Sequence, residues 1–270
     1  MVQDLTYKDN PELYEEVENI PGEKAMFSKA ADVIALFAAQ KRKPNKRGIS
    51  ILDLCCGTAP LYDYLLKHDY PNLHDETLFD KITGVDISPK YLEYAQIKYN
   101  SKLAYQQFDE DKGVKLEFIL HDAVDYNHSE KVDLILASSA YHHIEDERKI
   151  DFLKKVHSQL KDDGIAVFCE NLIDDYSNLE ERAISVTDFY TKRIDEMRAL
   201  GITDRRIELV QRILKYELDR DYEWKNSYNI FMKNLGEVGF KILGEYKVWP
   251  STKMFENYKV GDFVIIAGKK

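Results

Sequence analysis

Residues Ile51–Pro60, which read ILDLCCGTAP, decide the fold of this chain. An apolar run reaches an acid at Asp53 and then breaks into a loop of small residues around Gly57. Strands buried in a parallel sheet are near-continuous apolar runs, and ligands bind in the crevice beyond their carboxyl ends. The stretch therefore predicts a buried strand over 49–54 whose end forms a ligand site.

Strands and helices alternate along the following part of the chain. Apolar runs that end at Asp86, near Asp122 and around Ser138 repeat the pattern of the first strand. Such alternation predicts an α/β fold with a doubly wound, mostly parallel sheet. We expect strands over 49–54, 81–86, 115–120, 131–137 and 164–170, and helices over 60–68, 89–99 and 146–160.

The sequence divides into four regions. Residues 1–48 contain a helix with one apolar face and are expected to form an N-terminal helical cap, and residues 49–173 are expected to form the core. Residues 174–235 are charged, helical in period and almost free of strand-like runs, which indicates a helical lid insertion. Residues 236–270 contain two further strands, which predict an antiparallel hairpin at the edge of a seven-stranded sheet.

The composition indicates a globular, cytoplasmic protein. The 270 residues are 44% hydrophobic and 32% charged, and no apolar run reaches the length of a membrane span. Cys55 and Cys56 are adjacent and Cys169 lies far away, so the cysteines suggest neither a disulfide framework nor a zinc site. The formal net charge of −10 opposes general attraction to nucleic acid, and a homodimer is compatible with the sequence.

Gly57 and Asp86 carry the first functional inference. A glycine lets the backbone approach a ligand closely, and a helix that starts near Pro60 presents free amide donors to an anionic group. Asp86 closes the second strand, where an acid commonly accepts hydrogen bonds from two ribose hydroxyls. The GxGxxG pattern of dinucleotide sites is absent, so a nicotinamide enzyme is disfavoured.

In their order and spacing, the motifs resemble the class I S-adenosylmethionine-dependent methyltransferases. The resemblance runs from about Ile49 to Glu170 and rests on DLCCGTA at 53–59, VDIS at 85–88 and HDA at 121–123. It implies a Rossmann-like core, S-adenosyl-L-methionine as the cofactor and methyl transfer as the activity.

The resemblance also implies which residues hold the cofactor. Its ribose would bind at Asp86, its adenine near Asp122 and Ala123, and its methionine portion against the loop over 53–58. The expected cofactor-binding residues are Asp53, Cys55, Gly57, Thr58, Asp86, Ile87, Asp122, Ala123 and Ser138.

The first loop departs from the family pattern. The family usually has three glycines at alternate positions, and this chain keeps only Gly57, with Cys55 and Ala59 at the other two. Side chains at these positions narrow the pocket. We expect cofactor binding to survive, because Cys and Ala are small.

His142 and His143 are the expected catalytic residues. They follow the fourth strand, where a side chain can face the transferred methyl group, and a neutral imidazole can accept a proton near pH 7. Direct displacement needs chiefly alignment of the nucleophile, so a base is not required. Tyr141 and Glu170 are further candidates for the catalytic role. Aromatic residues of the lid could line a substrate pocket, and they are Tyr190, Tyr216, Tyr222, Trp224 and Tyr228.

The sequence thus predicts an enzyme that transfers a methyl group to an O or N atom of a small molecule. Two alternatives stay open. The helical insert followed by an edge hairpin also looks like the carboxy-S-adenosylmethionine synthases of tRNA modification, in which Arg212 would match the arginine that holds the added carboxylate. The replaced glycines motivate a non-catalytic, methyltransferase-like subunit that binds a partner protein.

Overall fold

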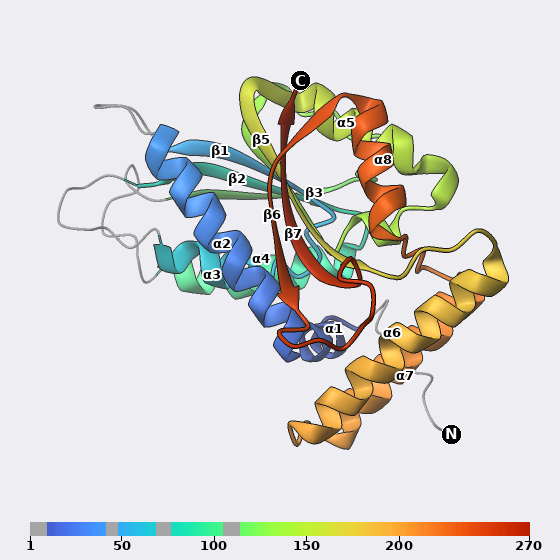
Figure 1. Ribbon diagram of the computed structural model, residues 1–270. Helices are drawn as coiled ribbons and strands as arrows, with labels where there is room; N and C mark the ends of the chain where they lie inside the picture. Colours follow the sequence, from blue (N-terminus) through green and yellow to red (C-terminus); the bar gives the residue numbers. More distant parts are fainter. Residues whose placement is uncertain (1–9, 42–47, 69–76, 105–113) are drawn as a thin grey trace.

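The computed structural model describes residues 10–41, 48–68, 77–104 and 114–270 (Figure 1). One seven-stranded sheet has the order β3-β2-β1-β4-β5-β7-β6. Strands β1 to β5 run parallel to one another, and β7 is antiparallel to both β5 and β6. The predicted fold class is therefore confirmed. The strands are β1 (Ile49–Leu54), β2 (Phe79–Asp86), β3 (Lys115–Leu120), β4 (Val132–Ser138), β5 (Leu160–Leu172), β6 (Phe240–Trp249) and β7 (Gly261–Lys269).

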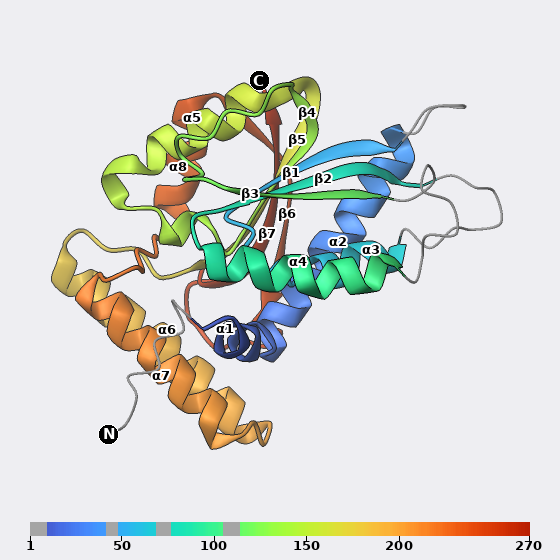
Figure 2. The same cartoon turned by 180° about the vertical axis from the view of Figure 1, so that it is seen from behind.

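Helices cover both faces of this sheet, which explains why its central strands are apolar throughout (Figures 1 and 2). One layer of buried side chains includes Met26, Leu65 and Tyr99, and the opposite layer includes Phe152 and Phe231. The first face is covered by α2 (Pro21–Lys41), α3 (Tyr62–His68) and α4 (Pro89–Ala104), and the second by α5 (Lys149–Gln159) and α8 (Tyr228–Val238).

Three more helices lie beyond the carboxyl ends of the parallel strands (Figure 1). They are α1 (Pro11–Glu18), α6 (Leu179–Ala199) and α7 (Asp204–Asp219). Helices α6 and α7 pack side by side as a hairpin that projects from the sheet, and α1 contacts both α7 and α4 (Figure 2). A separate core, which includes Leu13, Val17, Phe189 and Val210, holds these helices together.

Local signals in the sequence set where these helices start and end. The Asn10 side chain accepts a hydrogen bond from the Leu13 amide at 3.0 Å and so caps α1, and Asn178 caps α6 in the same way. Such a cap contributes about 1 kcal/mol because it satisfies an amide that the helix leaves unpaired. Helix α7 ends where Arg220 adopts a left-handed conformation.

Some elements differ from their expected bounds. The helix expected over 60–68 begins at Tyr62, and β5 starts earlier and ends later than 164–170. Helix α8 begins within the expected lid region 174–235 and ends at Val238, and it packs against α5 and β6 on the sheet. The projecting part of that region is therefore α6 and α7 alone.

The strand order reverses at β1, which lies between β2 and β4. Open parallel sheets bind ligands in the crevice outside the strand ends at such a reversal. Helix α1 and the α6–α7 hairpin lie at the same end of the sheet (Figure 1). None of the helices in the described residues is long and apolar enough to cross a membrane.

Candidate cofactor and acceptor site

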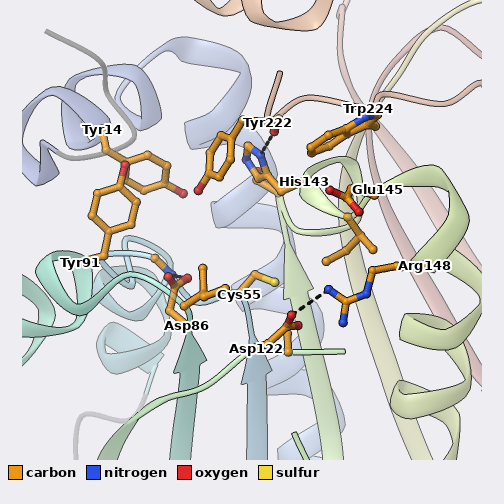
Figure 3. Close-up of a pocket in the computed structure, with 15 residues that line it drawn as sticks. Tyr14, Cys55, Asp86, Tyr91, Asp122, His143, Glu145, Arg148, Tyr222 and Trp224 are labelled. Atoms are coloured by element: carbon orange, nitrogen blue, oxygen red, sulfur yellow. Dashed lines mark hydrogen bonds and ion pairs between the residues drawn. The ribbon is translucent and has the colours of Figure 1, made fainter. Parts of the chain in front are cut away.

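A cavity of about 220 Å³, here called the first cavity, lies at the carboxyl ends of β1, β2 and β4 (Figure 3). Its walls combine sequence-predicted residues with residues from distant parts of the chain. The predicted ones are Cys55, Gly57, Asp86, Ile87, Asp122, Ala123 and His143. Tyr222 and Trp224, two of the predicted aromatic candidates, also line it. The others are Tyr14, Tyr91, Ser139, Ile144, Glu145 and Arg148.

Four predicted residues lie beside the first cavity rather than in its wall. His142 lines a second cavity, and Asp53 and Ser138 line a third, smaller one. Thr58 is fully buried, and its hydroxyl donates a hydrogen bond to Glu15 of α1 at 2.7 Å. Thr58 thus ties the loop after β1 to the N-terminal helix.

Asp86 closes β2 and is held in one orientation by backbone amides. Its Oδ2 accepts a hydrogen bond from the Gly57 amide and its Oδ1 one from the Ser88 amide, both at 2.8 Å. Burial raises the pKa of Asp86, and the two amide donors offset part of that shift. Each carboxylate oxygen can accept a second hydrogen bond, so the side chain is prepared to receive two donors from the cavity.

The loop after β1 has a left-handed backbone at Gly57 and at the two positions where Cys55 and Ala59 stand. Cys55, Gly57 and Ala59 have φ angles of 63°, 55° and 58°, all in the left-handed region. In this region a residue other than glycine lowers the free energy of unfolding by on the order of 1–2 kcal/mol, because its Cβ atom lies too close to the backbone. Cys55 and Ala59 are therefore in a strained conformation, and Cys55 and Gly57 of this loop line the first cavity.

Gly57 is needed for a second reason, which is the close approach of α1. A Cβ atom at this position would lie 3.2 Å from the Tyr14 ring. Real side chains rarely approach so closely, so the ring would have to move. Gly57 thus lets Tyr14 cover the loop.

Asp122 is paired with a cation that sequence reasoning missed. Arg148 donates to its Oδ2 at 2.8 Å and to Asp125 at 3.1 Å, while the Val124 amide donates to its Oδ1 at 2.8 Å (Figure 3). The pair joins the end of β3 to the turn before α5. No local pattern marks Arg148, because its partners lie more than 20 residues away in the chain.

Aromatic rings form the side of the first cavity that faces the helices. Tyr14 of α1 and Tyr91 of α4 lie with ring centroids 4.9 Å apart, and Tyr222 lies 4.8 Å from the His143 ring (Figure 3). Burial raises the pKa of Tyr14 well above its ordinary value, so the phenol stays neutral. The sequence pointed to Tyr222 and Trp224 as lining candidates but gave no signal for Tyr14 or Tyr91.

His142 is buried in a hydrogen-bonded pair with Glu170. Its Nδ1 lies 2.7 Å from Glu170 Oε2, and Glu170 also accepts a hydrogen bond from the Tyr141 amide at 2.7 Å. Burial lowers the pKa of His142 well below its ordinary value and raises the pKa of Glu170 to about 7. The favoured arrangement is a neutral imidazole whose Nδ1–H donates to the carboxylate, which leaves Nε2 as an acceptor.

His143 stands at the boundary between the first and second cavities and lines both. Its Nδ1 lies 2.8 Å from the Tyr222 carbonyl oxygen, which can only accept a hydrogen bond. Nδ1 therefore carries the proton in a neutral ring, and Nε2 is available as an acceptor. The segment after α7 fixes this arrangement, because the Trp224 amide donates to the His142 carbonyl at 2.7 Å.

The second cavity lies between α1, the hairpin and the His pair. Tyr14, Ser139 and His143 line both this cavity and the first, so the two are neighbours. Its other walls carry charge from Glu18, Glu23, Arg193, Glu223 and Lys225, and apolar surface from Val17, Ile20, Val210 and Ile213. Tyr190, one of the predicted aromatic candidates, also lines it, whereas Tyr216, Tyr228 and Arg212 line none of the three cavities.

Within the described ranges, His142, His143 and Glu223 are the side chains whose donor atoms could hold a metal ion, since they lie within 4.8 Å of one another. Glu223 already has a cationic partner, because Lys225 Nζ lies 2.8 Å from its Oε2. Although burial raises the pKa of Glu223, the Lys225 ammonium outweighs it and the net shift is downward. The carboxylate that would complete such a site is therefore already paired with a buried ammonium.

The chain belongs to a known family. A family model described as a methyltransferase domain matches residues 23–219. Together with the sheet order and the motifs at its strand ends, this match makes the protein a member of the class I S-adenosylmethionine-dependent methyltransferases. A search of curated proteins found no match to the chain.

Solved structures of methyltransferases share the fold over nearly the whole chain. The magnesium protoporphyrin IX methyltransferase from Synechocystis PCC 6803 with bound SAH is 16% identical, with a TM-score of 0.58 over 98% of this chain and 96% of that one. An S-adenosylmethionine-dependent methyltransferase from Clostridium acetobutylicum ATCC 824 is 15% identical, with a TM-score of 0.58 over 97% and 98%. The plantazolicin methyltransferase BpumL is 16% identical, with a TM-score of 0.56 over 97% and 90%. At such identities the likeness concerns the fold.

Proposed function

We propose that the protein is an enzyme that uses S-adenosyl-L-methionine to methylate an O or N atom of a small molecule. The observation that carries this proposal is the Asp86 carboxylate, which the Gly57 and Ser88 amides hold at the wall of the first cavity. Its oxygens retain acceptor capacity for the two hydroxyls of a ribose.

Other residues of the site fit the rest of the cofactor. Asp122 and Ala123 line the first cavity on the side where adenine would be held. Asp53 Oδ1 and the Ser139 hydroxyl are buried without a partner among the described residues, and both line the third cavity next to the loop after β1. These oxygens suit the ammonium group of the methionine portion. When bound, the cofactor supplies an electrophilic methyl group.

The second cavity is the proposed place of the methyl acceptor. It shares the wall formed by Tyr14, Ser139 and His143 with the first cavity, so an acceptor there lies next to the cofactor. The chief contribution of the protein is alignment of the nucleophile with the methyl carbon. Nε2 of His143 can accept the proton that a hydroxyl or amine nucleophile releases.

A small acceptor is supported by the enclosure of the second cavity by α1, α6 and α7. Structural neighbours are named for magnesium protoporphyrin IX and for plantazolicin, which are not nucleic acids. Arg212 lines none of the three cavities, so no observation favours the carboxylated cofactor. The Asp86 carboxylate that two amides hold at the wall of an open cavity argues against a non-catalytic subunit.

Calorimetric titration of the purified chain with S-adenosylmethionine and S-adenosylhomocysteine tests the proposal. We expect dissociation constants in the micromolar range or below for both. Mass spectrometry of any ligand carried through purification provides an independent check. Failure of both nucleosides to bind the folded chain would overturn the proposal.

A further inference from the structure

The acids of the second cavity lack sufficient cationic partners. Glu18, Glu23 and Glu223 line it together with two permanently cationic side chains, Arg193 and Lys225, and with the imidazoles of His142 and His143. Both cationic side chains already pair with acids. Arg193 contacts Glu23 and Asp262, and Lys225 contacts Glu217 and Glu223. Glu217 also pairs with the buried Arg182, so within the described residues five acids share three permanently charged bases.

Two carboxylate oxygens in this wall have no hydrogen-bond partner in the described part of the chain. They are Oε2 of Glu18 and Oε2 of Glu23, whose residues are only 7% and 5% exposed. The other oxygen of Glu23 is used, since it accepts hydrogen bonds from Arg193 at 3.1 Å and Asn171 at 3.2 Å. Buried acceptors without donors are costly, so these oxygens call for a ligand that supplies donors.

Both oxygens belong to carboxylates, so a positively charged hydrogen-bond donor suits them better than a neutral one. An ammonium group carries three N–H donors and no acceptor, and it brings the positive charge that the surplus of acids lacks. A hydroxyl brings one donor and no charge. Burial and the neighbouring Glu23 charge raise the pKa of Glu18 well above its ordinary value, as expected where a cation is missing.

The remaining wall of the second cavity indicates what else the ligand contains. Val17 and Ile20 near α1 face Val210 and Ile213 of α7 across the cavity. The cavity measures about 40 Å³, whereas one water needs about 10–15 Å³. This volume would accommodate an amino group with a short apolar stem, and a larger ligand would extend toward the first cavity.

We propose that the methyl acceptor is a small molecule with a cationic amino group, which Glu18 and Glu23 bind in the second cavity. This inference rests on the proposed function and names the acceptor class for the same site. Glu18 also lines the third cavity, where the cofactor's own ammonium would lie, whereas Glu23 does not. Glu23 therefore distinguishes acceptor binding from cofactor binding.

The test uses straight-chain primary amines from ethylamine to hexylamine, each compared with the alcohol of the same length. Binding to the full chain saturated with S-adenosylhomocysteine is measured by saturation-transfer NMR and competition. We expect at least one amine to bind about tenfold more tightly than its alcohol, because charge-assisted hydrogen bonds are the stronger ones.

Glu18→Gln and Glu23→Gln should each reduce this preference to about threefold or less. Glu16→Gln is the matched control, because Glu16 lies on the same helix but pairs with the exposed Arg205 and lines none of the three cavities. It should leave the preference unchanged. Retained binding of S-adenosylhomocysteine by Glu23→Gln shows that this variant is folded.

Equal binding of amines and alcohols, or no binding of any amine, would overturn the inference, as would a preference that survives in Glu23→Gln. If S-adenosylhomocysteine itself fails to bind, the proposed function falls instead. In that case the same amines and alcohols, measured without nucleoside, still test whether Glu18 and Glu23 prefer a cationic ligand. The two failures are therefore distinguishable.

Discussion

The Gly57 amide donates a hydrogen bond to Asp86 Oδ2 at 2.8 Å, which joins the loop after β1 to the end of β2. Two motifs that lie 29 residues apart in the sequence thus form one wall of the first cavity. The bond also orients the carboxylate toward the space where a ribose would lie. Loss of this hydrogen bond should therefore reduce cofactor affinity more than it reduces the free energy of unfolding.

Asp86→Asn should weaken binding of S-adenosylhomocysteine by about 1–3 kcal/mol, because the amide offers one acceptor where the carboxylate offers two. Calorimetry measures the change, and Asp151→Asn is the control, since Asp151 pairs only with the exposed Lys154 on α5. Unchanged affinity in Asp86→Asn would remove the ribose assignment.

Gly57→Ala should lower both stability and cofactor affinity, because the new Cβ meets the Tyr14 ring in addition to the left-handed backbone. Gly201→Ala is the matched control, with a φ of 69° and no atom within 4 Å of the added Cβ. It should cost on the order of 1 kcal/mol of unfolding free energy and leave affinity intact. Thermal unfolding and titration of both variants separate the clash from the strain. Equal cofactor affinities of the two variants would show that the Tyr14 ring can move without weakening cofactor binding.

Cys55→Gly should stabilise the fold by up to about 1 kcal/mol, because glycine adopts a φ of 63° without a steric penalty. Cys55→Ala removes the thiol and keeps the strain, so it should give no such gain. Chemical denaturation of the two variants measures the difference. A gain in Cys55→Ala as large as in Cys55→Gly would assign the effect to the sulfur instead.

Glu170→Gln should change how stability depends on pH. Burial raises the pKa of Glu170 to about 7 in the folded protein, while the unfolded value is near 4.5. The folded state therefore binds more protons between those values, and this group's contribution to stability falls as pH rises through that window. The wild type minus Glu170→Gln difference in unfolding free energy should decline by up to about 3 kcal/mol from pH 4.5 to 7. A constant difference would show that Glu170 titrates normally.

The cofactor side of the site could be predicted because it lies at strand ends. Parallel strands bring their carboxyl ends to one edge, so Gly57, Asp86 and Asp122 had to converge once the strands were found. The fold class followed from the same alternation of strands and helices. Each of these signals is local in the sequence.

The acceptor side could not be predicted, because it is assembled by contacts between distant helices. Tyr14 and Glu18 are one turn apart on α1, and nothing in their spacing distinguishes a cavity wall from an ordinary helix face. Arg148 and Glu23 likewise take part in the site only through contacts with residues far away in the sequence. The left-handed conformation of Cys55 was equally hidden, because the sequence predicts that a side chain narrows the loop but does not predict the φ angle of that residue.

Tyr14 forms part of the wall of both the first and the second cavity. Any ligand that shifts this ring therefore changes the free energy of the other site, and such coupling is reciprocal by thermodynamic necessity. The factor by which S-adenosylhomocysteine alters amine affinity must equal the factor by which the amine alters nucleoside affinity. One aromatic side chain on a short helix thus links the two proposed binding sites.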